Sequence, residues 1–179
     1  MSSIYHQADL KGCEIAFNII NQYPNYITSW THTPGDTDGY DIQMTCTYPD
    51  GLVREEEAEC KNREESLYTL EYMKKNGVMY EMDKLNKQFQ RLELGIPQHF
   101  INSTYDSYVI WYYVDTLPIE EIRECYNEAL TTKQNNKWCF WSWQRPKTYT
   151  TCEKKRILKV ILPFPDDNNR YGTVIGYDE

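Results

Sequence analysis

Glu59 and Lys61, in the first half of the chain, have the spacing of two side chains that act together. They lie in the stretch "EEEAECK" (55–61), and residues two apart in a β-strand project from the same face. A carboxylate binds hard cations such as Mg²⁺ or Mn²⁺. A neighbouring ammonium can orient a water molecule or neutralise a developing anion, so the pair is suited to metal-assisted hydrolysis of a phosphodiester bond.

A predicted β-hairpin supplies a second carboxylate. The segment "YDIQMTCTY" (40–48) alternates apolar and polar residues, "PDG" is a turn signal, and "LVREEEAECKN" follows as the returning strand. Asp41 is at the start of the first strand, so the hairpin allows its carboxylate to approach Glu59. Two carboxylates and a backbone carbonyl would form an oxygen site for Mg²⁺ or Mn²⁺.

The choice of acids stays open at this point. Asp36 and Asp38 in "GDTDGYD" compete with Asp41, and Glu57 replaces Glu59 if the strand register shifts by two residues. A different interpretation treats the glutamate-rich stretch as a solvated edge strand whose charges prevent pairing with other sheets.

The spacing of the acids is similar to that of a known nuclease superfamily. Asp41, followed after 17 residues by Glu59-Cys60-Lys61, resembles the D…(D/E)xK signature of the PD-(D/E)XK, or restriction-endonuclease-like, nucleases. The resemblance implies that Asp41 and Glu59 are metal ligands, that Cys60 contributes its backbone carbonyl, and that Lys61 is the catalytic lysine. Mg²⁺ or Mn²⁺ would be the cofactor. Tyr40 stands where the signature often has proline.

The order of the predicted elements extends the resemblance over roughly residues 3–115. A helix at 3–22 carries Glu14, which the resemblance makes a helix acid near the metal. A helix with Lys84 and Lys87 follows the strand of the signature, and the aromatic run 108–115 comes next as a buried strand. The resemblance implies an α/β fold with a mixed β-sheet core and flanking helices. It also implies an endonuclease acting on nucleic acid, here DNA, and a homodimer for cleavage of both strands.

The net charge of −8 would argue against nucleic acid if it were evenly distributed. Residues 133–159, however, carry eight basic side chains and one acidic, whereas residues 1–132 carry ten basic and 22 acidic. The basic segment also contains tryptophans suited to stacking or to core packing. We therefore predict that it binds phosphates without reading sequence, through these residues: Lys137, Arg145, Lys147, Lys154, Lys155 and Arg156.

The remaining patterns predict one domain over residues 1–179, with a basic, aromatic-rich part at 133–164. Gly77 would divide the region 64–94 into two helices, and apolar residues at helical spacing mark the second one. Further elements are expected as follows: strand 25–33, helix 118–130, strand 137–143 and strand 156–164.

The compartment is predicted from what the sequence lacks. No apolar run reaches the length of a transmembrane helix, and the first residues do not form a secretory signal. The six cysteines have neither the spacing of a zinc site nor that of a disulfide framework, which favours free thiols in a reducing compartment. We expect a protein of the cytoplasm, or of a virion if it is viral.

Two classes of function follow. The first is a Mg²⁺-dependent nuclease, whose compact length would suit a phage or mobile element. The second is a non-catalytic binding or structural protein of the same fold, such as a DNA mimic, a virion component or an interaction module. In the second class the acidic surface and the aromatic residues would bind a protein partner.

Overall fold

The computed structural model describes residues 4–22, 29–32, 42–47, 50–124, 137–142, 145–151, 159–165 and 170–176. Within these residues the chain is an α/β structure around a mixed β-sheet of six strands, in the order β1-β2-β3-β5-β6-β10. The strands are β1 (Ser29–His32), β2 (Ile42–Thr47), β3 (Val53–Asn62), β5 (Gln98–Ser103), β6 (Val109–Tyr113) and β10 (Gly172–Ile175).

β3 is the central strand on which the sheet changes direction. It pairs antiparallel with β2, where Ile42 is opposite Ala58, and parallel with β5, where Glu59 is opposite Phe100. All other neighbours in the sheet are antiparallel. A parallel pair needs a long crossover connection, and the helices between β3 and β5 supply it. The predicted hairpin of β2 and β3 is confirmed, with β1 as an additional antiparallel strand.

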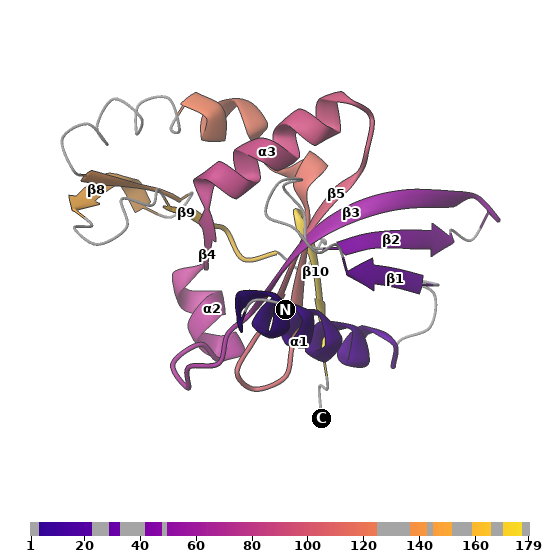
Figure 1. The fold of residues 1–179 in the computed structure, drawn as a ribbon. Helices are drawn as coiled ribbons and strands as arrows, with labels where there is room; N and C mark the ends of the chain where they lie inside the picture. The colour runs from indigo at the N-terminus through magenta and orange to yellow at the C-terminus, as the bar shows by residue number, and fades with distance from the viewer. Residues whose placement is uncertain are drawn as a thin grey trace.

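Helix α1 (Ile4–Ile20) covers one face of the sheet (Figure 1). Its buried residues include Cys13, Ala16 and Phe17, which pack on Ala58 and Cys60 of β3. The apolar positions of α1 recur every three or four residues, so one stripe of the helix faces the sheet. The helix predicted at 3–22 is therefore confirmed, and α1 lies on the face of β3 that carries the even-numbered side chains.

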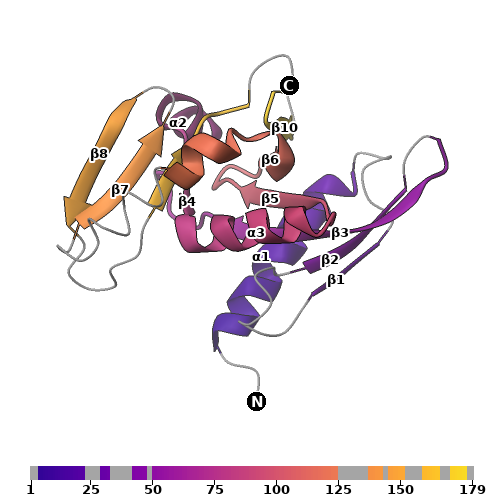
Figure 2. The ribbon, with the colours of Figure 1, turned by 90° about the horizontal axis from the view of Figure 1, so that it is seen from above.

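Helix α3 (Met82–Glu93) covers the opposite face (Figure 2). The shorter α2 (Leu70–Asn76) adds Leu70 and Met73 to the core on this side. Met82, Leu85 and Phe89 of α3 are buried against Phe100 of β5 in a second core cluster. Gly77 ends α2 at φ 76°, and a Cβ there would lie 2.6 Å from the carbonyl oxygen of Leu162. Both the backbone conformation and the close contact require glycine at this position.

Two short ribbons complete the described structure. β4 (Val78–Glu81) pairs with β9 (Lys159–Leu162), and β7 (Lys137–Ser142) pairs with β8 (Arg145–Thr151). β7 lies against β9, so the two ribbons adjoin at the end of the molecule opposite the β1–β3 strands (Figure 2). A single 3₁₀ turn (Val114–Thr116) follows β6, and residues 119–124 begin the predicted helix at 118–130.

Some predicted elements need correction. The region 64–94 is helix, strand and helix rather than two helices, because β4 follows Gly77 directly. β5, β8 and β10 were not predicted from the sequence. The interpretation of 55–61 as a solvated edge strand is wrong: β3 has a neighbour on each side, and Glu56, Glu57 and Glu59 are 2%, 4% and 3% exposed. Glu55 alone of these glutamates is exposed.

No helix in the described part of the chain is both long and apolar enough to cross a membrane. Cys13, Cys46 and Cys60 are buried free thiols.

Candidate metal and phosphate site

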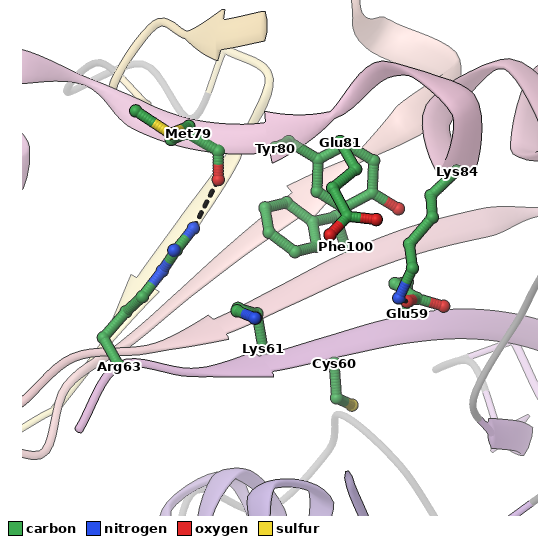
Figure 3. Close-up of a pocket in the computed structure, with 9 residues that line it drawn as sticks. All are labelled: Glu59, Cys60, Lys61, Arg63, Met79, Tyr80, Glu81, Lys84 and Phe100. Carbon is green, nitrogen blue, oxygen red and sulfur yellow. Dashed lines mark hydrogen bonds and ion pairs between the residues drawn. The ribbon is translucent and has the colours of Figure 1, made fainter. Parts of the chain in front are cut away.

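Glu59 and Lys61 project from the same face of β3, as predicted, and both line one small pocket (Figure 3). The pocket has a volume of about 30 Å³. That volume holds roughly two water molecules, or a metal ion with a water. We call it the Glu59 pocket; it is lined by Glu59, Cys60, Lys61, Arg63, Met79, Tyr80, Glu81, Lys84 and Phe100.

The carboxylate of Glu59 is buried and forms an ion pair with the ammonium of Lys84. A buried carboxylate requires a cation or several hydrogen-bond donors. Lys84 lies in the first turns of α3, and its side chain is 45% exposed, so it reaches Glu59 from the solvent side. A divalent ion at Glu59 would therefore have to share or displace this ammonium.

Glu81 places a second carboxylate at the Glu59 pocket. It is the last residue of β4 and the N-cap of α3, and its side chain extends from β4 toward the space between Lys61 and Lys84 in Figure 3. Two carboxylates that line a pocket of this size form a hard oxygen donor set, which suits Mg²⁺ or Mn²⁺.

Cys60 of β3 also lines the Glu59 pocket. Glu57 and Arg63 direct their backbone N–H groups toward the β5 side, as donors to carbonyls there. Because backbone groups of successive strand residues alternate in direction, the carbonyl of Cys60 points toward the β2 side. On the β2 side of β3, the last described residue pair is Ile42 with Ala58, two residues before Cys60. The role of the Cys60 carbonyl as a metal ligand stays a prediction.

Asp41 lies outside the described residues, so its approach to Glu59 stays a prediction. It directly precedes Ile42, whose partner Ala58 directly precedes Glu59. Asp36 and Asp38 also lie outside the described residues. In the described ranges there is no group of three or more His, Cys, Asp or Glu side chains arranged to hold a metal ion. A fully coordinated ion thus needs Asp41, water or substrate oxygens in addition.

Glu57, the alternative to Glu59, has a different set of partners. Arg91 of α3 donates from Nε and Nη2 to its two carboxylate oxygens, at 2.8 and 2.6 Å. Gln98 Nε2 donates to Oε1 at 2.8 Å. These three bonds join β3, α3 and β5, and Glu57 does not line the Glu59 pocket. Glu57 therefore fixes α3 on the sheet.

Glu56 is buried on the other face of β3. Its Oε2 lies 3.5 Å from Nε2 of His99, while Trp111 Nε1 donates to His99 Nδ1 at 2.9 Å. Since Nδ1 accepts, the neutral imidazole carries its proton on Nε2, facing Glu56. A hydrogen bond with Glu56 also raises the pKa of the Cys46 thiol, although burial is the larger cause. These groups face the core beneath α1.

Glu14 is exposed on α1, which packs on the face of β3 opposite the Glu59 pocket. It lines neither the Glu59 pocket nor the larger pocket beside it. The structure therefore does not bring Glu14 together with Glu59, and its role as a helix acid gains no support.

The basic C-terminal segment is described in part. Lys137 lies on β7, and Arg145 and Lys147 lie on β8. Lys154, Lys155 and Arg156 lie outside the described residues. The β7–β8 ribbon is connected to the Glu59 pocket through β9 and β4, because β4 contributes Met79, Tyr80 and Glu81 to the pocket wall.

Three charged residues of the pocket were not predicted as site residues. Arg63 is two residues beyond Lys61, so strand alternation could have indicated it. Lys84 was noted only as a lysine on the helix after β3, and no local pattern links it to Glu59. Glu81 follows the glycine-terminated helix α2 as the end of a four-residue strand, which is too short to predict.

Comparisons of the chain with protein-family models, with curated proteins and with solved structures found no match.

Proposed function

We propose that the protein is a metal-dependent nuclease whose active site is the Glu59 pocket. The observation that carries the proposal is the convergence of Glu59, Glu81 and Lys61 on one small pocket beside the central strand. The order of α1, the antiparallel strands, β3 and a lysine-bearing helix is also the order that the resemblance to PD-(D/E)XK nucleases implies.

In this proposal the carboxylates of Glu59 and Glu81 and the carbonyl of Cys60 hold Mg²⁺ or Mn²⁺, with Asp41 as a further ligand. The bound ion would polarise the scissile phosphate and lower the pKa of an attacking water. Lys61 orients that water and neutralises charge on the phosphate. Its side chain is exposed, and no described side chain pairs with its ammonium, so it is placed to meet an incoming phosphate.

The position of the basic ribbon supports a polymeric substrate. β7 and β8 carry Lys137, Arg145 and Lys147 and adjoin the wall of the Glu59 pocket through β9. Phosphates on either side of the scissile bond could then contact this ribbon, which would hold the strand without reading its sequence. DNA remains the proposed substrate polymer.

A non-catalytic binding protein is the second candidate, and the pair Glu59–Lys84 favours it. The ammonium of Lys84 already compensates the buried carboxylate, so the fold needs no metal ion to satisfy Glu59. In such a protein the same cluster would be a structural ion pair at the base of a surface pocket.

A cleavage assay separates the two candidates. The wild-type protein is incubated with single-stranded, duplex and branched DNA and with RNA, in Mg²⁺ or Mn²⁺, beside Glu59→Gln and Lys61→Ala. We expect metal-dependent cleavage by the wild type and losses of about 10²- to 10³-fold in each variant, because each removes one electrostatic stabiliser of the transition state.

Lys87→Ala is the matched control, since Lys87 is an exposed lysine of α3 that does not line the pocket. It should cleave like the wild type. An absence of cleavage on all four substrates, or equal cleavage by wild type and Glu59→Gln, would reject the proposal and favour the binding protein.

A further inference from the structure

A second, larger pocket adjoins the Glu59 pocket at the end of β3. Its volume is about 370 Å³, within the range of small-molecule sites, about 300–1,000 Å³. We call it the Tyr68 pocket; it is lined by Gly12, Cys60, Lys61, Asn62, Arg63, Glu64, Glu65 and Tyr68. Cys60, Lys61 and Arg63 line both pockets. A ligand in the Tyr68 pocket would therefore lie directly beside the Glu59 pocket.

Arg63 is a fixed part of the wall between the two pockets. Its Nε donates to Asn102 Oδ1 at 2.9 Å, and its Nη2 donates to the carbonyl of Met79. Burial lowers the pKa of the guanidinium, and the nearby Tyr68 and Glu81 act in the opposite direction. Because Nε and Nη2 are engaged within the protein, Arg63 supports the pocket wall.

Tyr68 is held from several sides. The guanidinium carbon of Arg63 lies 5.5 Å from the centre of its ring, and Tyr72 packs edge-on against it at 5.8 Å. Its backbone carbonyl accepts from the N–H of Tyr105 at 2.9 Å. An aromatic ring that is already fixed loses little conformational freedom when a flat ligand packs against it, which favours binding.

The charges of the Tyr68 pocket are separated along the chain. Lys61 lies on β3, whereas Glu64 and Glu65 lie on the loop beyond the strand and are exposed. In the sequence, Asn62 lies between Lys61 and the two glutamates. Ser103 Oγ donates to Asn62 Oδ1 at 3.0 Å, so the amide N–H groups of Asn62 remain as donors. An anionic group would be attracted to the Lys61 side and repelled from the glutamate side.

From this combination we propose that the Tyr68 pocket binds one unpaired nucleotide of a single-stranded nucleic acid, with the base against Tyr68 and a phosphate at Lys61. The proposal rests on the proposed function, since it makes the adjoining phosphodiester the one that the Glu59 pocket cleaves. A pocket that encloses one base leaves no room for its pairing partner. Single strands and unpaired junction nucleotides are therefore the substrates, and a duplex would have to unstack a base first.

Binding without cleavage tests this proposal. A short single-stranded DNA oligonucleotide containing 2-aminopurine is titrated into the protein in EDTA, and its fluorescence gives the Kd; a duplex of the same sequence is titrated in parallel. We expect the single strand to bind more tightly than the duplex. Tyr68→Ala should weaken single-strand binding about 10-fold, the effect of losing one base–aromatic contact.

Tyr105→Ala is the matched control, because it removes an exposed tyrosine side chain that does not line the pocket and keeps the backbone N–H that bonds Tyr68; its Kd should stay within about 2-fold of the wild type. Lys61→Ala serves as a second variant, since this exposed side chain is not needed for folding. It should lower the slope of log Kd against log salt by about 0.7, the value for one phosphate contact on a single strand.

The outcomes separate this proposal from the proposed function. Binding that depends on Tyr68 without any cleavage in Mg²⁺ would support the pocket and reject the nuclease. Cleavage together with oligonucleotide binding that is equal in wild type, Tyr68→Ala and Lys61→Ala would support the nuclease and overturn the nucleotide pocket. Equal affinity for duplex and single strand would also overturn it.

Discussion

Glu57 and Glu59 lie on the same face of β3, only two residues apart, yet they have different surroundings. Glu57 is satisfied by three hydrogen bonds from Arg91 and Gln98, which tie α3 and β5 to the strand. Glu59 is equally buried, but its ion-pair partner is the half-exposed Lys84, and it borders a pocket with Glu81 and Lys61.

The difference shows which buried carboxylate is available for chemistry. A carboxylate with a bidentate arginine and an amide donor has little remaining capacity to bind an ion, and its removal leaves a buried charge without a partner. A carboxylate whose ion-pair partner is a half-exposed lysine can exchange that ammonium for another cation. We therefore infer that Glu57 stabilises the fold and that Glu59 serves the site.

The largest expected effect on stability is that of Glu57→Gln. Arg91 would lose its counterion, and the free energy of unfolding should fall by about 3 kcal/mol, at the low end for a broken buried pair because Arg91 is 30% exposed. Glu59→Gln should have a much smaller effect, since the side chain of Lys84 is 45% exposed and water can solvate its ammonium. Urea denaturation of both variants measures the difference. Equal losses of stability would remove the distinction between the two glutamates.

An intermediate effect is expected for Lys84→Met. In the metal-free protein the ammonium of Lys84 competes with a divalent ion for Glu59, so its removal should tighten Mn²⁺ binding by about 1.5- to 5-fold, the range for a partly exposed ion pair. Lys87→Met, at an exposed position of the same helix, is the control and should bind Mn²⁺ like the wild type. Weaker binding in Lys84→Met would mean that the lysine supports the metal site.

The smallest effect is expected for Glu14→Gln. Glu14 is exposed on α1, across the sheet from the Glu59 pocket, so cleavage and Mn²⁺ affinity should both stay within about 2-fold of the wild type. Initial rates of cleavage of a single-stranded substrate provide the measurement. A loss of about 10-fold or more would restore Glu14 to the site and contradict the placement of α1.

The local patterns of the sequence predicted the hairpin, the amphipathic helices and the shared face of Glu59 and Lys61. They did not predict β5, because its sequence "QHFINS" mixes polar and apolar residues while all six are buried. The polar members of β5 are buried because they contact side chains distant in sequence; Gln98, for example, bonds Glu57.

The burial of the glutamates was missed for the same reason. Local rules place four glutamates in five positions at the surface, and only the partners from α3 and β5 make burial possible. Arg91 is 34 residues from Glu57, and Lys84 is 25 residues from Glu59. Such pairs form only because the crossover connection brings α3 onto the sheet. The periodicity of a short segment cannot predict that packing.

Titration of Mn²⁺ into the wild type, Glu59→Gln and Glu57→Gln by calorimetry tests most directly whether the Glu59 pocket is the metal site. We predict binding by the wild type and by folded Glu57→Gln, and a loss of affinity of at least about 10-fold in Glu59→Gln, which removes a charged ligand. Equal Mn²⁺ affinity in wild type and Glu59→Gln, or a loss in Glu57→Gln alone, would contradict the assignment.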